Sequence, residues 1–503
     1  MKIFSASQIR EIDAYTIKNE PIESIDLMER AANALFNEII YIVDKNKAIK
    51  IFAGPGNNGG DGLALARMLA NDRYKVEVYI LKIKEFSDDF SVNLKRLENQ
   101  QKVKIKYIVN SDAFPVIKDE EIIIDALFGS GLTRPLDGLA LLLVKYINSF
   151  SANVISIDIP SGLFCDDNTD NNYEGVIRAK YTFSFQFPKL SFLFSENEDY
   201  VGKWKVLPIG LHPEIIEKTC TNYYFIKDED IRKIIKIRKK FSHKGTYGHA
   251  LLISGGYGKM GAAVLASGAC LRSGSGLVTI HIPKHGINIL QTSVPEVMIS
   301  IDKNEKYFSV LPDLSVFNAY GVGPGIGTNL NTQKTLKKLL LAVNKPLVID
   351  ADALNILSIH KEWLNNIPAF SILTPHPKEF ERLVGKAKNS FHRISMQIAF
   401  ASKYNVCVIL KGAYTSVAFP DGNCYFNSTG NPGMATGGSG DVLTGIITGL
   451  LAQGYNSYEA SILGVYMHGL AGDIAAAELS EESMTAGDII NFLSEAFRRI
   501  KLK

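Results

Sequence analysis

Residues 430–445 read GNPGMATGGSGDVLTG and lead into the apolar run Val442–Leu451, which predicts a buried helix. The glycines before that helix let backbone N–H groups crowd around an anion, and a helix N-terminus adds partial positive charge. This arrangement suits phosphate. Asp441 places a carboxylate where an anion should bind, which indicates a base that acts on a hydroxyl group. The alternative is that Asp441 is only the N-cap of the helix.

Around this motif, strand-length apolar runs alternate with helical patterns, which implies parallel strands and right-handed crossovers. In the first half we predict strands at Ile49–Ala53, Val76–Leu81, Val103–Ile108, Ile122–Ala126 and Val154–Ile159, with helices at Leu63–Ala70 and Leu139–Ile147. In the second half we predict strands at Ala250–Ser254, Leu277–Ile282, Val316–Val322, Pro346–Asp350, Ser371–Thr374 and Val406–Lys411, then helices at Asp441–Leu451, Tyr458–Leu479 and Ala486–Ile500. The chain is therefore predicted to form two α/β domains, residues 1–225 and 226–503, joined at the basic segment Asp228–Lys240, which is expected to be a solvated linker.

Composition is that of a soluble globular protein, with 46% hydrophobic and 21% charged residues among 503. A net charge of +3 argues neither for nor against nucleic acid. The five cysteines lack CxxC spacing and do not suit a disulfide framework, so Cys270 and Cys407 are expected to be buried hydrophobic residues. Neither a signal peptide nor an uninterrupted apolar run of about twenty residues is found, so we expect a cytoplasmic protein without a membrane span.

The loop GPGNNGGDG at residues 54–62 follows a predicted strand and opens a helix, the position where open α/β sheets bind ligands. Its spacing is not that of the dinucleotide-binding fingerprint. The carbonyl oxygens of Asn57 and Asn58 suit a weakly charged cation, and their amide groups suit phosphate. The alternative is a tight loop capped by Asp61.

Two further strands end on acids, Asp125 and Asp158, each followed by a glycine-containing turn. Together with Asp61 they place three carboxylates at one edge of a parallel sheet, which is unlike three independent caps. Neighbouring carboxylates need a cation or a raised pKa, and either outcome favours proton abstraction.

Five motifs of the first half occur in the order found in the NAD(P)H-hydrate epimerase domain, which the chain resembles over roughly residues 1–220. They are QIREID at 8–13, LMERAA at 27–32, NNGGDG at 57–62, DALFGSG at 125–131 and DIPSG at 158–162. The resemblance implies a Rossmann-like three-layer domain with Asp158 as base and a potassium ion bound by Asn58, Asp125 and Ser161. It implies substrate contacts from Asn57, Asn58, Gly59, Gly60, Asp61, Gly129, Ser130, Gly131, Leu132, Thr133, Arg134, Pro135 and Asp158.

In the second half, glycine-rich segments at 255–263 and 321–327 each follow a predicted strand. His376 lies between two prolines at a helix start, which fixes its direction; it is either structural or a ligand contact. The segment Lys411–Thr415 follows a strand and offers an ammonium group, backbone amides and a hydroxyl to a phosphate.

These segments, with the turn at 437–441, resemble the ADP- or ATP-dependent NAD(P)H-hydrate dehydratase, whose fold is ribokinase-like, over roughly residues 230–503. The resemblance implies substrate contacts from Ala262, Gly325, His376 and Asp441, with Asp441 as a catalytic residue. It implies nucleotide contacts, with magnesium, from Lys411, Gly412, Ala413, Tyr414, Thr415 and Gly440. Lys378, Tyr414 and Ser439 depart from the family's usual residues, which bears on the fit of the nucleotide and not on the reaction class.

Both resemblances imply repair of hydrated NADH or NADPH: the first domain interconverts the R and S forms, and the second dehydrates the S form with ADP or ATP and releases phosphate. The resemblance also implies a homo-oligomer without nucleic-acid or membrane partners. The alternative is a ribokinase-type kinase of a vitamin precursor whose first half only binds. Preference for ADP or ATP, and for NADH or NADPH, is left open.

Overall fold

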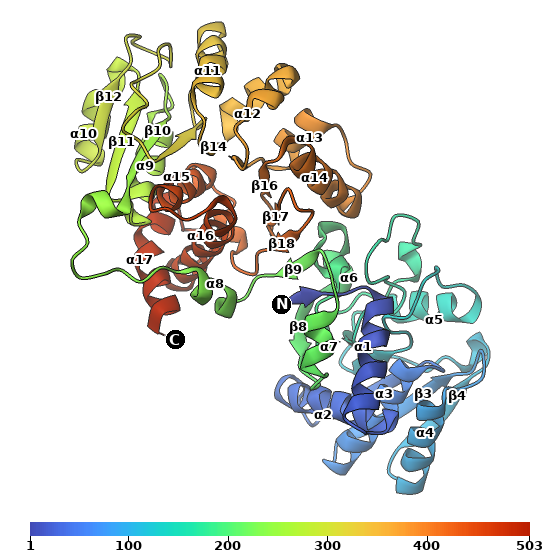
Figure 1. The fold of residues 1–503 in the computed structure, drawn as a ribbon. Coiled ribbons are helices and arrows are strands. Elements are labelled where there is room, and N and C mark those ends of the chain that lie inside the picture. Colours follow the sequence, from blue (N-terminus) through green and yellow to red (C-terminus); the bar gives the residue numbers. More distant parts are fainter. Residues whose placement is uncertain (503) are drawn as a thin grey trace. The chain divides into compact units, whose positions relative to one another are not determined.

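The computed structural model describes residues 1–502, which divide into two compact units (Figure 1). Unit 1 comprises Met1–Thr221 together with Asn389–Phe391, and unit 2 comprises the rest of the described chain from Asn222 onward.

Unit 1 is built on a parallel sheet with strand order β4-β3-β2-β5-β6-β7-β8. Its strands are β1 (Lys2–Ile3), β2 (Ala48–Ala53), β3 (Lys75–Leu81), β4 (Lys104–Ile108), β5 (Ile122–Ala126), β6 (Asn153–Ile157), β7 (Tyr181–Phe185) and β8 (Lys203–Leu207), of which β1 lies outside this sheet. Its α-helices are α1 (Ala6–Asn19), α2 (Ser24–Ile42), α3 (Asn57–Asn71), α4 (Asp88–Gln100), α5 (Gly138–Asn148), α6 (Glu198–Val201) and α7 (Pro213–Lys218).

Alternate residues of the central strands pack into two separate cores, which makes unit 1 a three-layer sandwich. Ile51 and Ile124 pack with Leu35 and Leu63 of α2 and α3. Their strand neighbours Phe52 and Ile123 pack with Leu143 and Val144 of α5 on the other face. Burial on both faces is the reason these strands read as continuous β-branched runs.

Unit 2 contains a mixed sheet with strand order β9-β18-β17-β16-β15-β14-β13-β10-β11-β12. Its strands are β9 (Tyr223–Phe225), β10 (His249–Ile253), β11 (Leu277–Ile282), β12 (Met298–Ile301), β13 (Ala319–Val322), β14 (Leu347–Ile349), β15 (Ile372–Leu373), β16 (Cys407–Leu410), β17 (Ser416–Ala418) and β18 (Cys424–Phe426). Its α-helices are α8 (Asp228–Ile234), α9 (Met260–Arg272), α10 (Ile287–Ser293), α11 (Leu330–Ala342), α12 (Ala351–Ile359), α13 (Pro377–Val384), α14 (Ser390–Tyr404), α15 (Ser439–Ala452), α16 (Ser457–Leu479) and α17 (Ala486–Leu502).

Three features differ from the sequence predictions. Strands β7, β8, β9, β12, β17 and β18 were not predicted, and β16–β17–β18 is an antiparallel meander in place of parallel crossovers. Strand β6 ends at Ile157, so Asp158 lies just beyond it. The predicted junction at 228–240 is partly anchored on unit 2: Ile231 is fully buried, and Lys236 and Arg238 donate hydrogen bonds to the carbonyls of Gly454 and Gly274. Its basic cluster, Lys233, Lys236, Arg238, Lys239 and Lys240, is exposed, as expected for a solvated segment.

Helix α16 is long and apolar enough to cross a membrane by length and composition, but 72% of that apolar window is buried inside the protein. Its residues Leu463, Tyr466 and Met467 pack in the core of unit 2 against α15 and α17. The helix is therefore a core element of this fold. Cys270 and Cys407 are also fully buried, as predicted, and the five cysteines are all free.

Candidate active sites

In unit 1, β3 and β4 lie on one side of β2, and β5 lies on its other side, so the strand order switches between β2 and β5. Predicted site residues lie at the carboxyl ends of these two strands. Such a switch point is where open α/β sheets bind ligands. Asn58 lies in the first turn of α3, directly after β2, and Asp125 lies near the end of β5. A Cβ added at Gly129 would lie 3.3 Å from the side chain of Asn58, so the loop after β5 passes close to that amide.

The three predicted potassium ligands are buried together around Asp125. Ser161 donates to Asp125 Oδ1 through its hydroxyl (2.5 Å) and to Oδ2 through its backbone N–H (2.8 Å). Burial raises the pKa of Asp125, and these hydrogen bonds oppose that rise. The side-chain nitrogen of Asn58 is buried and, among residues 1–502, has no hydrogen-bond partner. Rotation of the Asn58 amide by half a turn would place its carbonyl oxygen where the nitrogen now lies without a partner. That oxygen could then face a cation, so the oxygen atoms of Asn58, Asp125 and Ser161 fit potassium.

Asp158 follows β6 with a left-handed backbone (φ +64°) and is 6% exposed. Its Oδ1 atom is held by the ammonium group of Lys189 at 2.8 Å and by the backbone N–H of Phe185 at 3.2 Å. Ser184 donates weakly to the same oxygen at 3.4 Å. No hydrogen bond to Oδ2 is found in the described chain, so that oxygen is left for a ligand.

Two more carboxyl groups lie in the electrostatic field of Asp158. Burial raises the pKa of Asp13 in α1 to about 6, and the charge of Asp158 adds to the rise. Burial also raises the pKa of Asp61 well above its usual range, again with a contribution from Asp158. Unit 1 therefore combines an ion-paired carboxylate with two neighbouring carboxyl groups whose pKa values are raised.

Only part of the predicted substrate loop at 129–135 is buried next to this site. Gly129 and Ser130 are half-buried, and Cys165 Sγ contacts the carbonyl of Ser130 at 3.4 Å. Gly131, Thr133, Arg134 and Pro135 are exposed, and Leu132 is half-buried. Asn57, Gly59, Gly60 and Asp61 all belong to the first turns of α3.

In unit 2 the direction of strand addition reverses between β10 and β13, and the two glycine-rich loops meet there. Gly255 donates a backbone hydrogen bond to Pro324 (2.8 Å), and a Cβ added at Gly256 would lie 2.8 Å from the carbonyl oxygen of Gly325. A Cβ at Gly325 would in turn lie 3.3 Å from that of Ala262. The fold thus brings the predicted substrate residues Ala262 and Gly325 together.

The predicted phosphate-binding turn lies beside Asp350, which follows β14 and is 1% exposed. Asp350 Oδ1 pairs with the Lys411 ammonium group at 2.9 Å, and Oδ2 accepts a hydrogen bond from Thr444 of α15 at 2.8 Å. Gly438 caps α15 in a left-handed conformation (φ +92°), and a Cβ at Gly440 would lie 3.2 Å from Lys411 Nζ. Lys411 is therefore held against the N-terminus of the helix that carries Asp441.

Asp441 lies in the first turn of α15. Burial raises its pKa to about 6; the negative charge of Asp350 adds to the rise and Lys411 opposes it. His468 of α16 holds the turn in place by a hydrogen bond, because its Nε2 lies 3.0 Å from the carbonyl oxygen of Ser439. Burial lowers the pKa of His468 to about 4, so it is a neutral donor at physiological pH.

His376 is the N-cap of α13, where its Nδ1 accepts a hydrogen bond from the backbone N–H of Lys378 at 3.1 Å. This structural role leaves its assignment as a substrate contact a prediction. Residues 411–415 form the loop of the β16–β17 hairpin, in which Gly412 donates to the Thr415 hydroxyl at 3.2 Å.

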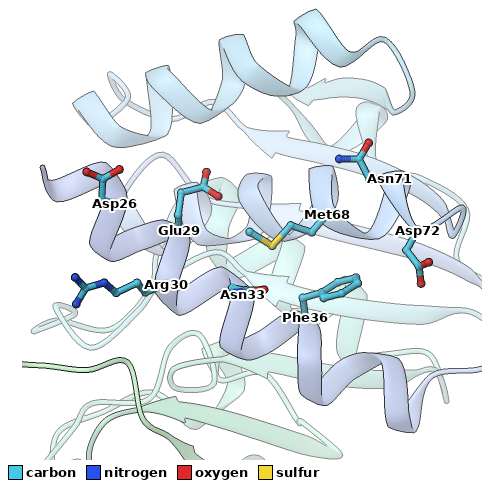
Figure 2. Close-up of a pocket in the computed structure, with 8 residues that line it drawn as sticks. All are labelled: Asp26, Glu29, Arg30, Asn33, Phe36, Met68, Asn71 and Asp72. Carbon is cyan, nitrogen blue, oxygen red and sulfur yellow. The ribbon is translucent and has the colours of Figure 1, made fainter. Parts of the chain in front are cut away.

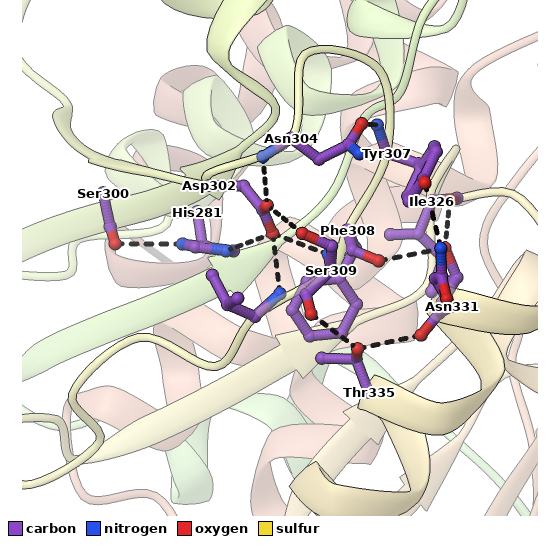
Figure 3. A network of polar contacts seen from close by, with 12 residues as sticks. His281, Ser300, Asp302, Asn304, Tyr307, Phe308, Ser309, Ile326, Asn331 and Thr335 are labelled. Carbon is purple, nitrogen blue, oxygen red and sulfur yellow. Dashed lines mark hydrogen bonds and ion pairs between the residues drawn. The ribbon is translucent and has the colours of Figure 1, made fainter.

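A polar network steadies both glycine-rich loops of unit 2 (Figure 3). His281 of β11 contacts Asp302 at 3.1 Å, and Asp302 accepts backbone hydrogen bonds from Ser309 and Val310 at 2.7 and 3.0 Å. The loop that Asp302 holds also supplies the carbonyl of Lys306 to the N–H of Tyr257, at 2.9 Å. The network thereby holds the loop that precedes α9.

The chain matches two family models, YjeF-related protein N-terminus over residues 24–191 and NAD(P)H-hydrate dehydratase over residues 250–495. It is 34% identical to the bifunctional NAD(P)H-hydrate repair enzyme of Moorella thermoacetica, over 100% of this chain and 97% of the relative. The chain belongs to the bifunctional NAD(P)H-hydrate repair enzymes. The enzyme of that name from Escherichia coli strain K12 is 31% identical over 93% of this chain and 88% of its own length.

One solved structure similar to this repair enzyme is the ADP/ATP-dependent NAD(P)H-hydrate dehydratase of Bacillus subtilis, co-crystallised with ATP and Mg²⁺. It shares 30% identity and a TM-score of 0.50, and the match covers 56% of this chain and 100% of that one. The predicted fold class, two α/β units with a ribokinase-like second unit, is thus confirmed.

A surface groove of about 660 Å³ lies between α2 and α3 in unit 1 (Figure 2). It is lined by Asp26, Glu29, Arg30, Asn33, Phe36, Met68, Asn71 and Asp72. None of these is a predicted site residue, and Glu29 is already paired with Arg67 and Arg96.

Sequence reasoning missed several residues that the fold places in the two sites. In unit 1 they are Lys189 and Asp13, and in unit 2 they are Asp350, Thr444 and His468. Asp350 ends a predicted strand just as Asp125 and Asp158 do, and that signal could have found it. Lys189, which lies a few residues beyond an unpredicted strand, carried no such signal.

Proposed function

We propose that unit 1 interconverts the R and S forms of hydrated NADH or NADPH, and that unit 2 dehydrates the S form with ADP or ATP as phosphoryl donor. The observation that carries this proposal is the turn at 437–441, where a half-buried acid with a raised pKa lies near a lysine held at a helix N-terminus. A base beside a phosphate site is what phosphorylation of a hydroxyl group requires.

For dehydration, the substrate hydroxyl is a poor leaving group until it is phosphorylated. Asp441 removes the hydroxyl proton as the oxygen attacks the terminal phosphoryl group of the nucleotide. Lys411 and the N–H groups of the turn stabilise the charge that develops during transfer. Elimination of phosphate then restores the ring double bond. Magnesium in proteins is held largely by substrate phosphates, so we propose that it enters with the nucleotide.

For epimerisation, Asp158 is the proposed base, because its Oδ2 atom is unpartnered while its Oδ1 is fixed by three donors. Potassium, held by Asn58, Asp125 and Ser161, would supply positive charge for the substrate's anionic groups. We further propose a cytoplasmic homo-oligomer without nucleic-acid or membrane partners, which size-exclusion chromatography and fractionation test.

The function is tested by incubating the protein with mixed epimers of hydrated NADH, with ADP and ATP in parallel reactions. We expect NADH absorbance to recover and inorganic phosphate to appear in equal amounts. A stable phosphorylated product without NADH would show a ribokinase-type kinase instead. Consumption of only the S form would show that unit 1 binds without catalysing.

Potassium removal is expected to slow epimerisation by about tenfold or more, as typically follows when a metal site is perturbed. The protein is dialysed into tetramethylammonium buffer and the conversion of pure R form to S is followed by chromatography. Asn58→Ala is expected to behave like the potassium-depleted protein at every potassium concentration. The exposed Asn19→Ala should respond like the wild type. An epimerisation rate indifferent to potassium contradicts the assignment.

A further inference from the structure

The strongest unexplained feature of unit 1 is a buried lysine. Lys189 is 1% exposed, and its ammonium group lies 2.8 Å from Asp158 Oδ1. Burying an ammonium group is costly unless it is paired and hydrogen-bonded, and a buried ion pair by itself is weak evidence for stability. A lysine kept in this position therefore needs another explanation.

The contacts of Asp158 give that explanation, because they are all made on one oxygen. Lys189, Phe185 and Ser184 each contact Oδ1, at 2.8, 3.2 and 3.4 Å. Lys189 and these donors come from β7 and the residues that follow it, whereas Asp158 follows β6. Neighbouring strands thus fix the carboxylate from one side and leave its second oxygen open.

The surroundings of this pair are acidic, so the lysine is its nearest counter-charge. The titratable groups that face the pair are Asp13 and Arg10 of α1, Asp61 of α3, and Cys165 with Asp166 after β6. Asp13 and Asp61 both interact electrostatically with Asp158. Lys189 is therefore the cation that contacts Asp158 in a largely acidic site.

We propose that Lys189 is a positioning residue for epimerisation: it fixes Oδ1 of Asp158, so that Oδ2 is oriented toward the substrate as the base. This inference rests on the proposed epimerase function of unit 1. It assigns to Lys189 no contact with the substrate.

Lys189→Met is the test. We expect the kcat for conversion of R to S to fall by about 10²-fold at neutral pH, the typical cost of misplacing a catalytic group. We also expect KM for the R form to stay near its wild-type value, because Lys189 orients the base and does not contact the substrate. The control is Lys205→Met, which removes an exposed lysine of the same unit that pairs with Glu38.

Lys189→Arg keeps the positive charge and serves if the methionine variant does not fold. It can donate hydrogen bonds to the same carboxylate oxygen, so it is expected to recover part of the lost kcat. The proposal is overturned if Lys189→Met epimerises at the wild-type rate, if its loss lies in KM with kcat unchanged, or if Lys189→Arg recovers none of the lost kcat. If wild-type protein itself does not interconvert the epimers, the proposed function fails and not merely this inference.

Discussion

An Asp441→Asn variant is expected to lose dehydration of the S form by about 10²–10⁴-fold, the range typical for removal of a general base. Asparagine keeps the size of the side chain, and the N-cap of α15 is Gly438, so the turn around residue 441 should persist. Epimerisation in unit 1 should be unchanged. The measurement is the initial rate of NADH recovery from pure S form with saturating nucleotide.

The pH dependence of dehydration by the wild type provides a second test of the role of Asp441. A base works only when ionised, and the raised pKa of Asp441, about 6, means that dehydration should weaken as pH falls through that value. The variant should lack this acidic limb. Ionised Asp441 is disfavoured by its buried site, so its replacement by a neutral amide should not lower the melting temperature at pH 8.

The matched control is Asp421→Asn, which changes an exposed acid of the same unit. It should dehydrate the S form at the wild-type rate. The N-cap alternative for Asp441 is wrong, because Gly438 holds that position. If Asp441→Asn retains most of its activity, Asp441 is not the base and another residue must supply it.

Asp158→Asn is expected to reduce epimerisation by about 10²–10⁴-fold, again the cost of a lost base. Asparagine is the better replacement than alanine here, because Asp158 has φ +64°, a region that asparagine tolerates and alanine does not. Given mixed epimers and nucleotide, the variant should consume the S form and then stop. The residual R form is quantified by chromatography after subtraction of spontaneous epimerisation.

Asp112→Asn, an exposed acid of unit 1, is the control for this variant and should leave both epimers consumed. Disappearance of both epimers at the wild-type rate in Asp158→Asn would refute its role as base. The two variants together make opposite predictions for the two activities, so a general loss of folding cannot mimic either result.

The sequence predicted the strands of the central sheets and the loops that follow them, because a parallel strand buried on both faces is a continuous apolar run. It failed at the edges, where strands such as β8 and β12 are half-exposed and carry polar residues. It also failed at the hairpin after Lys411, whose strands are only three residues long.

The predicted site residues were those marked by glycines or by an acid at a strand end. Asp158, Asp125 and Asp441 could be found in this way. Lys189 could not, since its importance lies in a contact with a residue on a neighbouring strand. The contact between Lys189 and Asp158 depends on which strands are neighbours in the sheet, and this order cannot be predicted from the local sequence.

The apolar helix α16 has a consequence for how the chain is made. Of the elements that it packs against in unit 2, α8, β16 and α15 are synthesised before it, and α17 is synthesised after it. Until α16 leaves the ribosome, the elements made before it have an incomplete core and expose the apolar surface that α16 later covers. Exposed apolar surface of that kind favours aggregation. Folding of unit 2 is in this sense completed from its carboxyl end, and conditions that delay α16 should burden chaperones more than those that delay unit 1.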